Sequence, residues 1–188
     1  MEPGIARADT LKLSQMQTKQ AERALRVLMV LLFLGFIYVL KDAFTEHVVQ
    51  AGDKAPDFSI TADNGKTITR SNFGGRVLVL NFWATWCPPC VEEMPSLDVF
   101  ARQMQASGVV VLGVSVDKNE AAYKRFVQQV RPGFLTARDA EANISSDYGT
   151  FKWPETYVID KSGKVVQKHI GPKDWTDPKI MNDIKALL

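Results

Sequence analysis

Both cysteines of this 188-residue chain lie in one short run, Trp86-Cys87-Pro88-Pro89-Cys90. A spacing of two residues lets the two sulfurs reach bonding distance when the first cysteine stands at the start of a helix. At that position the first thiol faces the partial positive charge of the helix N-terminus, which stabilises its thiolate. We therefore predict thiol–disulfide exchange, with Cys87 as the nucleophile and Cys90 as the thiol that resolves the mixed disulfide.

Two simpler explanations of the pair are a structural disulfide and half of a zinc site. A disulfide that closes so short a loop contributes little chain-entropy stabilisation. Zinc needs two more ligands, and the histidines, His47 and His169, lie far from the cysteines in the sequence. The chain has no Gly-rich phosphate loop for a nicotinamide or flavin. We expect no metal and no cofactor beyond a redox-active Cys87–Cys90 disulfide.

The residues around the pair indicate the elements that position it. Residues 77–84 form an apolar, β-favouring stretch typical of a buried strand, and residues 91–105 are typical of a helix. Similar patterns predict strands at 55–60, 67–69, 109–116, 134–136, 156–159 and 165–170, and helices at 119–130, 142–148 and 178–188. A strand hairpin followed by βαβα and ββα predicts an α/β domain, with a mixed central sheet flanked by helices on both faces.

An unbroken apolar run at residues 27–40 follows a polar, basic segment. The basic residues of that segment are Arg7, Lys12, Lys19, Arg23 and Arg26. Positive charge before the run predicts that the segment stays in the cytoplasm and that the rest is exported. The run also suits the core of a cleaved signal peptide. An uncleaved anchor is favoured because the basic segment is long, no small-residue cleavage site follows Leu40, and the Arg26 and Lys41 side chains can extend the span.

We therefore divide the chain into a cytoplasmic basic lead (1–26), a transmembrane signal anchor (27–40), a stalk (41–54) and a catalytic domain (55–188). This arrangement predicts a single-pass inner-membrane protein whose catalytic domain lies on the periplasmic, extracytoplasmic side. The composition, 46% hydrophobic and 23% charged, is typical of a globular domain. A net charge of +2, with basic and acidic residues interspersed beyond the lead, indicates no nucleic-acid partner.

Beyond the cysteine pair, the chain resembles the membrane-anchored thioredoxin-like reductases of the TlpA/ResA/CcmG type, which carry a thioredoxin-like domain of the AhpC/TSA–redoxin type. The resemblance covers roughly residues 50–188. Its motifs are Ala55-Pro56-Asp57-Phe58, the run Asn81 to Cys90, Glu93-Met94-Pro95 and Pro154-Glu155-Thr156. It implies a thioredoxin-like fold and a role in cytochrome c maturation or related extracytoplasmic disulfide reduction. The implied partners are disulfide-containing exported proteins, an apocytochrome c among them, and a membrane electron donor.

The resemblance also implies roles for residues outside the cysteine pair. Pro154 corresponds to the cis-proline that faces the dithiol and brings backbone groups beside it for an incoming peptide. Asn81 stands where plain thioredoxins carry a buried aspartate, and an amide cannot titrate. Glu93, at the position of the family's active-site glutamate, lies three residues after Cys90 on the same helix. We expect burial to raise its pKa so that it accepts the proton of the resolving thiol.

Four further residues are expected at the substrate-binding surface: Trp86, Pro88, Trp153 and Glu155. Glu155 would add negative potential near the dithiol. Trp153 departs from the family, which more often has a small or branched residue before the proline, so its bulk is expected to reshape partner docking. Asp117 and Asp160 are most simply explained as turn and cap residues.

The two prolines between the cysteines favour reduction as the direction of the reaction. Each lacks an N–H, so two donors that could hold the Cys87 thiolate are missing. A less stabilised thiolate makes the dithiol form less favourable and the couple more reducing.

Two alternative functions remain open on the same fold. A peroxiredoxin-like peroxide reductase resembles this chain less, because Ala84 stands where that chemistry has a threonine three residues before the reactive cysteine. A copper-binding or apocytochrome-binding module is the second alternative. Copper sites on such folds resemble C-x-x-x-C with a distant histidine, whereas the spacing here is one residue shorter and His169 is the only distant candidate.

Overall fold

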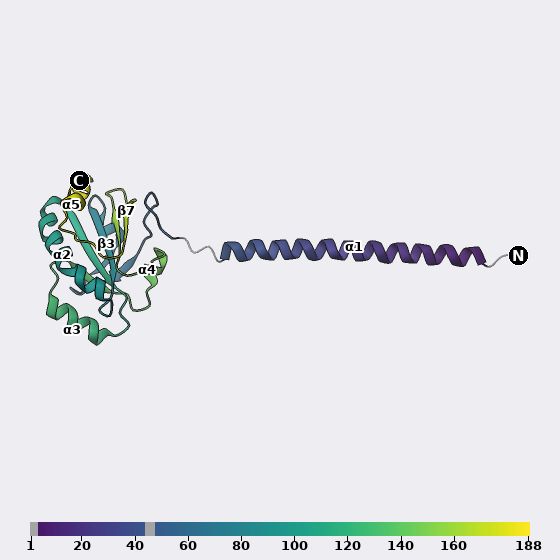
Figure 1. Cartoon of the computed structure of the whole chain (residues 1–188), viewed down its shortest axis with the longest axis horizontal. Coiled ribbons are helices and arrows are strands. Elements are labelled where there is room, and N and C mark those ends of the chain that lie inside the picture. The colour runs from purple at the N-terminus through teal and green to yellow at the C-terminus, as the bar shows by residue number, and fades with distance from the viewer. Residues whose placement is uncertain (1–3, 44–47) are drawn as a thin grey trace. The chain divides into compact units, whose positions relative to one another are not determined.

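The computed structural model describes residues 4–43 and 48–188, which form two separate units (Figure 1). The first unit is a single helix, α1 (Gly4–Ala43). The second is a compact α/β domain.

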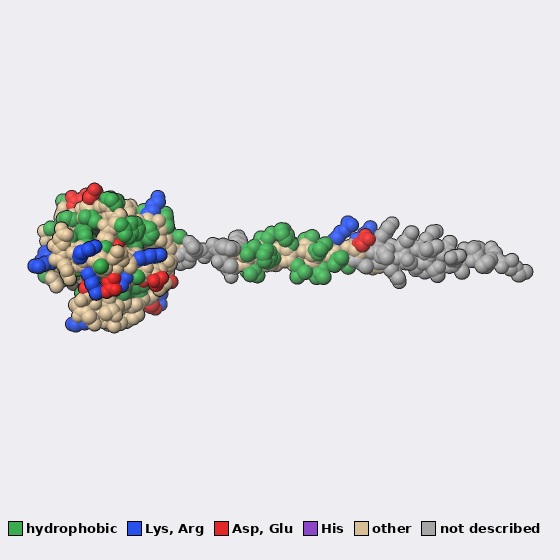
Figure 2. Space-filling model, turned by 90° about the horizontal axis from the view of Figure 1, so that it is seen from below, with side chains coloured by type: hydrophobic (Ala, Val, Ile, Leu, Met, Phe, Trp, Pro, Cys, Tyr) green, Lys and Arg blue, Asp and Glu red, His purple; other side chains and the backbone are tan. Residues whose placement is uncertain are grey.

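Within α1, the segment Glu22–Leu40 has a mean hydropathy of 2.1, and its side chains are not buried by the protein. Its 19 residues span about 28 Å at about 1.5 Å per residue, close to the thickness of a bilayer's hydrocarbon core. Figure 2 shows hydrophobic side chains along this segment and charged side chains at one end of it. In the sequence, Glu22, Arg23 and Arg26 stand at its N-terminal end. The segment is long and apolar enough to cross a membrane. A signal sequence near the N-terminus would have the same length and hydropathy.

The domain is built on a five-stranded sheet. Its strands, in spatial order, are β5 (Leu135–Arg138), β4 (Val109–Ser115), β3 (Val77–Trp83), β6 (Glu155–Ile159) and β7 (Val165–Ile170). β3, β4 and β5 run parallel, whereas β6 is antiparallel to both β3 and β7. The mixed central sheet that the sequence predicts is confirmed.

One face of the sheet is covered by three helices. They are α2 (Pro88–Met104), α3 (Glu120–Val130) and α5 (Pro178–Lys185). Val79 of β3 packs in one cluster with Leu97 and Phe100 of α2 and Ile184 of α5. α3 reaches the same face at Trp83, whose ring lies 6.0 Å from that of Tyr123 and 5.3 Å from that of Phe126.

The opposite face packs against the hairpin of β1 (Ser59–Thr61) and β2 (Thr67–Thr69) and against α4 (Asn143–Asp147). Leu80 and Phe82 of β3 point to this side, since side chains alternate along a strand. Helices therefore cover both faces, as the sequence predicts. Two short 3-10 helices, Arg70–Phe73 and Gln105–Ser107, complete the domain.

The prediction of a strand at 55–60 is wrong about where the strand begins, because β1 begins only at Ser59. Pro56 has no N–H to donate to a strand partner, which opposes an earlier start. The residues before it lie along β7 instead, where Gly52 donates its N–H to the carbonyl of Val165 at 2.8 Å. Val49 is buried, so the domain's contacts begin within the segment that we expected to form a stalk.

We expect Leu80→Ala to lower the free energy of unfolding by about 3 kcal/mol, because it leaves a cavity in the centre of a fully buried strand. Urea denaturation of the full-length chain in detergent, followed by tryptophan fluorescence, measures this effect. Val99→Ala on α2 is the matched control; with Val99 41% exposed, it should change the value by less than about 0.5 kcal/mol. Equal losses for the two variants would contradict this packing.

Candidate active site

The cysteine pair lies where the central strand ends and α2 begins. Cys87 is the N-cap of α2, and its Sγ accepts the backbone N–H of Cys90 at 3.3 Å. The two residues are joined by a disulfide, with Cα atoms 5.3 Å apart. Both are buried, Cys90 slightly more than Cys87. Since Pro88 and Pro89 have no N–H, the amide of Cys90 is the first in the helix that can donate to Cys87.

A buried carboxylate holds the loop that leads into Cys87. Oδ2 of Asp117 accepts the backbone N–H of Thr85 at 2.9 Å and the hydroxyl of Ser115 at 2.6 Å. Its Oδ1 accepts the Thr85 hydroxyl at 2.6 Å. We expected a simple turn residue here. Their positions indicate the contact: Trp83 of β3 pairs with Ser115 of β4, and Thr85 and Asp117 each lie two residues further along.

Glu93 is enclosed on the sheet side of α2. The residue is only 4% exposed, and its two carboxylate oxygens have separate donors. Oε1 accepts the side-chain amide of Asn81 at 2.9 Å, and Oε2 accepts the backbone N–H of Lys173 at 2.8 Å. Burial raises the pKa of Glu93 from its ordinary 4.5 to about 7, and these two donors oppose the shift. The indole of Trp175 also lowers this pKa, although its Nε1 has no acceptor within hydrogen-bonding distance among the described residues.

Asn81 links Glu93 to the strand that follows Pro154. Its Nδ2 donates both to Glu93 and to the hydroxyl of Thr156 at 2.8 Å. All three residues are buried. Sequence analysis singled out Asn81 because it cannot titrate, but it did not identify Thr156 as part of this network.

Pro154 and the two tryptophans lie on the cysteine side of the domain. The Trp153–Pro154 peptide bond is cis. Trp153 packs against the buried cluster that contains both cysteines, and its ring stands edge to face on Trp86 at 5.7 Å and 76°. Trp86 is 59% exposed, and Pro88 is also exposed. The structure therefore brings Cys87, Trp86 and Trp153 together.

Glu155 is not brought to this surface. It is fully buried, and its Oε1 pairs with Lys168 at 2.9 Å and accepts the hydroxyl of Tyr157. Lys168 also donates to the carbonyl of Val49 at 3.1 Å. Thr156 of the same strand points to Asn81, so Glu155 points to the opposite face of the sheet. Its negative charge is paired with Lys168 in the interior and does not lie at the substrate-binding surface.

Of the two histidines, the structure describes only His169. Nε2 of His169 bonds Oε1 of Gln167 at 3.1 Å, its ring stands edge to face on Trp175, and burial lowers its pKa. His47 lies outside the described residues. Within residues 48–188 that the structure describes, no group of three His, Cys, Asp or Glu side chains could hold a metal ion.

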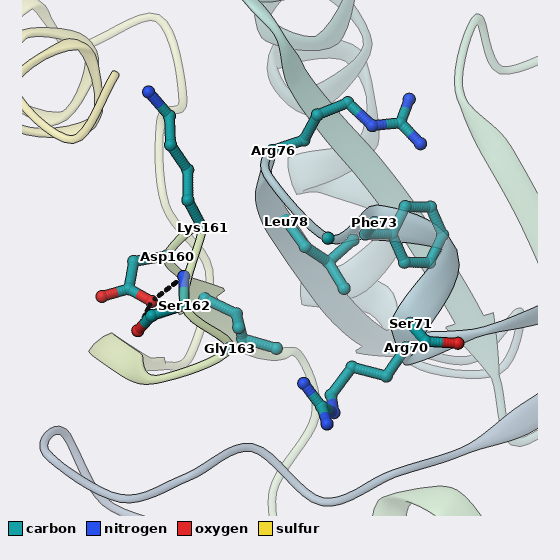
Figure 3. A pocket seen from close by; sticks show the side chains of 11 residues that line it. Arg70, Ser71, Phe73, Arg76, Leu78, Asp160, Lys161, Ser162 and Gly163 are labelled. Atoms are coloured by element: carbon teal, nitrogen blue, oxygen red, sulfur yellow. Dashed lines mark hydrogen bonds between the residues drawn. The ribbon is translucent and has the colours of Figure 1, made fainter.

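A cavity lies at the end of the sheet opposite the cysteine pair and is not part of this site. Its volume is about 80 Å³, and the end of β6 and the start of β3 line it. Figure 3 shows the cationic groups of Arg70, Arg76 and Lys161 pointing away from one another. Arg70 is already paired with Asp57 at 2.5 Å. The cavity therefore offers no convergent set of charges to a ligand.

Comparison with known proteins shows which family has this arrangement. Residues 50–184 match the family model described as Redoxin. The chain belongs to the redoxin family. It is 37% identical over 123 residues to the thiol-disulfide oxidoreductase ResA of Bacillus thuringiensis subsp. konkukian, a match that covers 65% of this chain and 71% of that protein.

Solved structures agree with this assignment. The thiol:disulfide interchange protein DsbE from Chlorobium tepidum superposes with a TM-score of 0.69 and 30% identity, covering 75% of this chain and 99% of that one. The exposed lipoprotein thioredoxin of Streptococcus pneumoniae strain TIGR4 gives 0.61 and 28%, covering 70% and 100%. The domain thus has the thioredoxin-like fold, and the protein is a thiol–disulfide oxidoreductase of the ResA/CcmG-like kind.

The raised pKa of Glu93 makes the stability of the oxidised protein depend on pH. In the unfolded chain Glu93 ionises near pH 4.5, whereas the folded protein keeps its proton until about pH 7. The contribution of Glu93 to stability is therefore fully present below pH 4.5 and falls by about 3 kcal/mol as the pH rises to about 7. We expect Glu93→Gln to lack this decline when unfolding by urea is measured at several pH values.

Glu92→Gln is the matched control for this measurement, because Glu92 is exposed on the same turn of α2. It should keep the pH dependence of the unsubstituted protein. Parallel pH profiles for Glu93→Gln and the unsubstituted protein would show that Glu93 does not titrate in this window.

Proposed function

We propose that this protein is a membrane-anchored reductase that reduces disulfides of exported proteins in an extracytoplasmic compartment. The observation that carries the proposal is a cysteine at the N-cap of α2 whose partner thiol is followed, one turn later, by the enclosed Glu93. This arrangement supplies a nucleophile, a resolving thiol and a proton acceptor on one short stretch of helix.

The reaction starts from the reduced enzyme. The Cys87 thiolate attacks one sulfur of a substrate disulfide, and the other substrate sulfur leaves as a thiolate that takes a proton from water. Cys90 then gives its proton to ionised Glu93, and the Cys90 thiolate attacks the Cys87 sulfur. The second substrate sulfur leaves as a thiolate that takes a proton from water, and the Cys87–Cys90 bond closes. Two electrons pass from the enzyme dithiol to the substrate, and a dithiol donor in the membrane must restore the enzyme.

Two features of the site support reduction as the direction. The first two positions of α2 are prolines, so among the described residues the Cys87 sulfur accepts one amide, that of Cys90 at 3.3 Å. A pKa of Glu93 near 7 leaves a fraction of the carboxylate ionised at neutral pH, ready to accept the Cys90 proton.

The proposed substrates are exported polypeptides with a disulfide, including an apocytochrome c whose two haem-attachment cysteines are oxidised. Exposed Trp86 and Pro88 flank Cys87 and supply a surface for such a chain. The similarity to a protein named ResA and to a DsbE structure supports this substrate class.

For the membrane arrangement we propose a cytoplasmic lead at 1–26, an uncleaved anchor at 27–40 and an extracytoplasmic catalytic domain. The apolar segment Glu22–Leu40 and the arginines at its N-terminal end support this orientation. The similarity to a structure titled an exposed lipoprotein thioredoxin supports the same compartment.

The alternatives have less support. A peroxidase would need a replacement for the missing threonine at Ala84, which is fully buried. A copper module would need a third ligand, and His169 bonds Gln167 instead.

A trapping experiment tests the roles of the two cysteines. We expect reduced Cys90→Ala to accumulate a stable mixed disulfide with an oxidised peptide, because no second thiol can release Cys87. The adduct is measured by non-reducing electrophoresis and mass spectrometry on the full-length chain. Cys87→Ser is the matched control and should form less than about a tenth as much adduct. Equal trapping by the two variants would contradict the assignment of Cys87 as nucleophile.

A reporter fusion tests the topology. Alkaline phosphatase fused after Leu188 should be active in a bacterial host, because that reporter needs export to form its own disulfides. The same fusion on a chain that begins at Lys41 is the control and should be inactive. An inactive full-length fusion would place the domain in the cytoplasm, and loss of an N-terminal tag from the membrane fraction would show that the segment is cleaved.

A further inference from the structure

A groove opens beside the disulfide, between the loop that carries Trp86 and the start of α3. Its volume is about 510 Å³. It is lined by Thr85, Trp86, residues 116–119 and Ala122, and we call it the Trp86 groove. The groove therefore combines an exposed aromatic ring with the end of β4 and the N-terminus of a helix.

The walls of the Trp86 groove are held in place by the rest of the domain. Asp117 bonds Thr85 and Ser115, which ties the β4 end of the groove to the active-site loop. The edge of Trp153 packs on Trp86 at 5.7 Å and supports its ring from the side. Trp153 thus supports the aromatic side of the groove, which Trp86 itself forms.

The charges at the Trp86 groove favour a negatively charged occupant. Lys118 lines the groove, is exposed, and has no ion-pair partner among the described side chains. Asp117 also lines it and carries a negative charge, but its carboxylate is buried and accepts hydrogen bonds at both oxygens, whereas Lys118 is exposed to an occupant. Glu120 lies next along the chain and is offset by two cations, Lys124 at 2.5 Å and Arg138 at 3.2 Å. The N-terminus of α3, capped by Asn119, adds partial positive charge.

The reaction itself brings a polypeptide to this place. The substrate sulfur in the mixed disulfide lies about 2 Å from the Cys87 sulfur, so the substrate residues beside it come within reach of Trp86, which directly precedes Cys87 and is exposed. We propose that the Trp86 groove binds the segment of the substrate next to its target cysteine, and that it selects an apolar side chain accompanied by a carboxylate. This inference rests on the proposed function and names its substrate class: disulfides flanked by acidic and apolar residues.

The test uses the reduced full-length chain in detergent and two oxidised peptides that differ in one residue type. Each peptide has a Cys-x-x-Cys disulfide, flanked on both sides by Glu-Phe in one and by Lys-Phe in the other. We expect the Glu-Phe peptide to be reduced about ten times faster at low salt, with the difference shrinking as ionic strength rises. Lys118→Ala should lower the rate for the Glu-Phe peptide about threefold, and Lys118→Glu should reverse the preference.

Lys164→Glu is the matched control, because Lys164 is also exposed but lies at the turn between β6 and β7, the opposite end of the sheet. It should leave the preference unchanged. A small neutral disulfide, 2-hydroxyethyl disulfide, is too short to enter the groove and should react equally with all three lysine variants and the unsubstituted protein.

The outcomes separate the two proposals. Failure to reduce 2-hydroxyethyl disulfide would overturn the proposed function itself. Normal reduction of it, with equal rates for the two peptides or equal effects of Lys118→Glu and Lys164→Glu, would overturn only the groove's selectivity. Rates for the Glu-Phe peptide that fall as the protein concentration rises would show that a second copy of the chain occupies the groove instead.

Discussion

The whole site depends on the hydrogen bonding of β3 along both of its edges. β4 runs parallel on one side and β6 antiparallel on the other, so the end of β3, the end of β4 and the start of β6 meet at one edge of the sheet. Cys87, Asp117 and Pro154 each stand within a few residues of these ends. A shift of one residue in the pairing would turn Asn81 to the opposite face and away from Glu93.

Burial then determines which group of this assembly can carry a proton. Asn81 occupies the interior of β3 as a neutral amide, and it donates to both Glu93 and Thr156 without changing its own charge. The titrating group of the site is therefore Glu93 on α2, and not the residue at position 81 of β3. Because α2 also carries Cys90, the proton acceptor and the resolving thiol are held by the same rigid element.

The chemistry of the site could be predicted because its main signal is local. The cysteine spacing, the strand before it and the helix after it lie within about thirty residues, and side-chain patterns report such segments directly. Asp117 could not be assigned in this way, since its partner Thr85 lies in the loop after β3, and only the pairing of β3 with β4 brings the two together.

Glu155 and residues 48–54 show two other reasons why sequence analysis falls short. Glu155 is next to the cis-proline in sequence, but alternation along β6 sends its side chain to the opposite face from Thr156. Residues 48–54 belong to the segment 41–54 that the sequence analysis assigned to a stalk. They join the domain largely through backbone hydrogen bonds, which side-chain composition does not report.

The same backbone bonds have a mechanical consequence for the membrane-anchored arrangement that we propose. Gly52 pairs with Val165 of the edge strand β7, Lys54 pairs with Lys164 just before that strand, and Lys168 of β7 donates to the carbonyl of Val49. Tension that reaches the domain through its N-terminus would load these contacts along the outermost strand first. The central strand β3 and the Cys87–Cys90 disulfide that follows it would keep their positions while these outer contacts break.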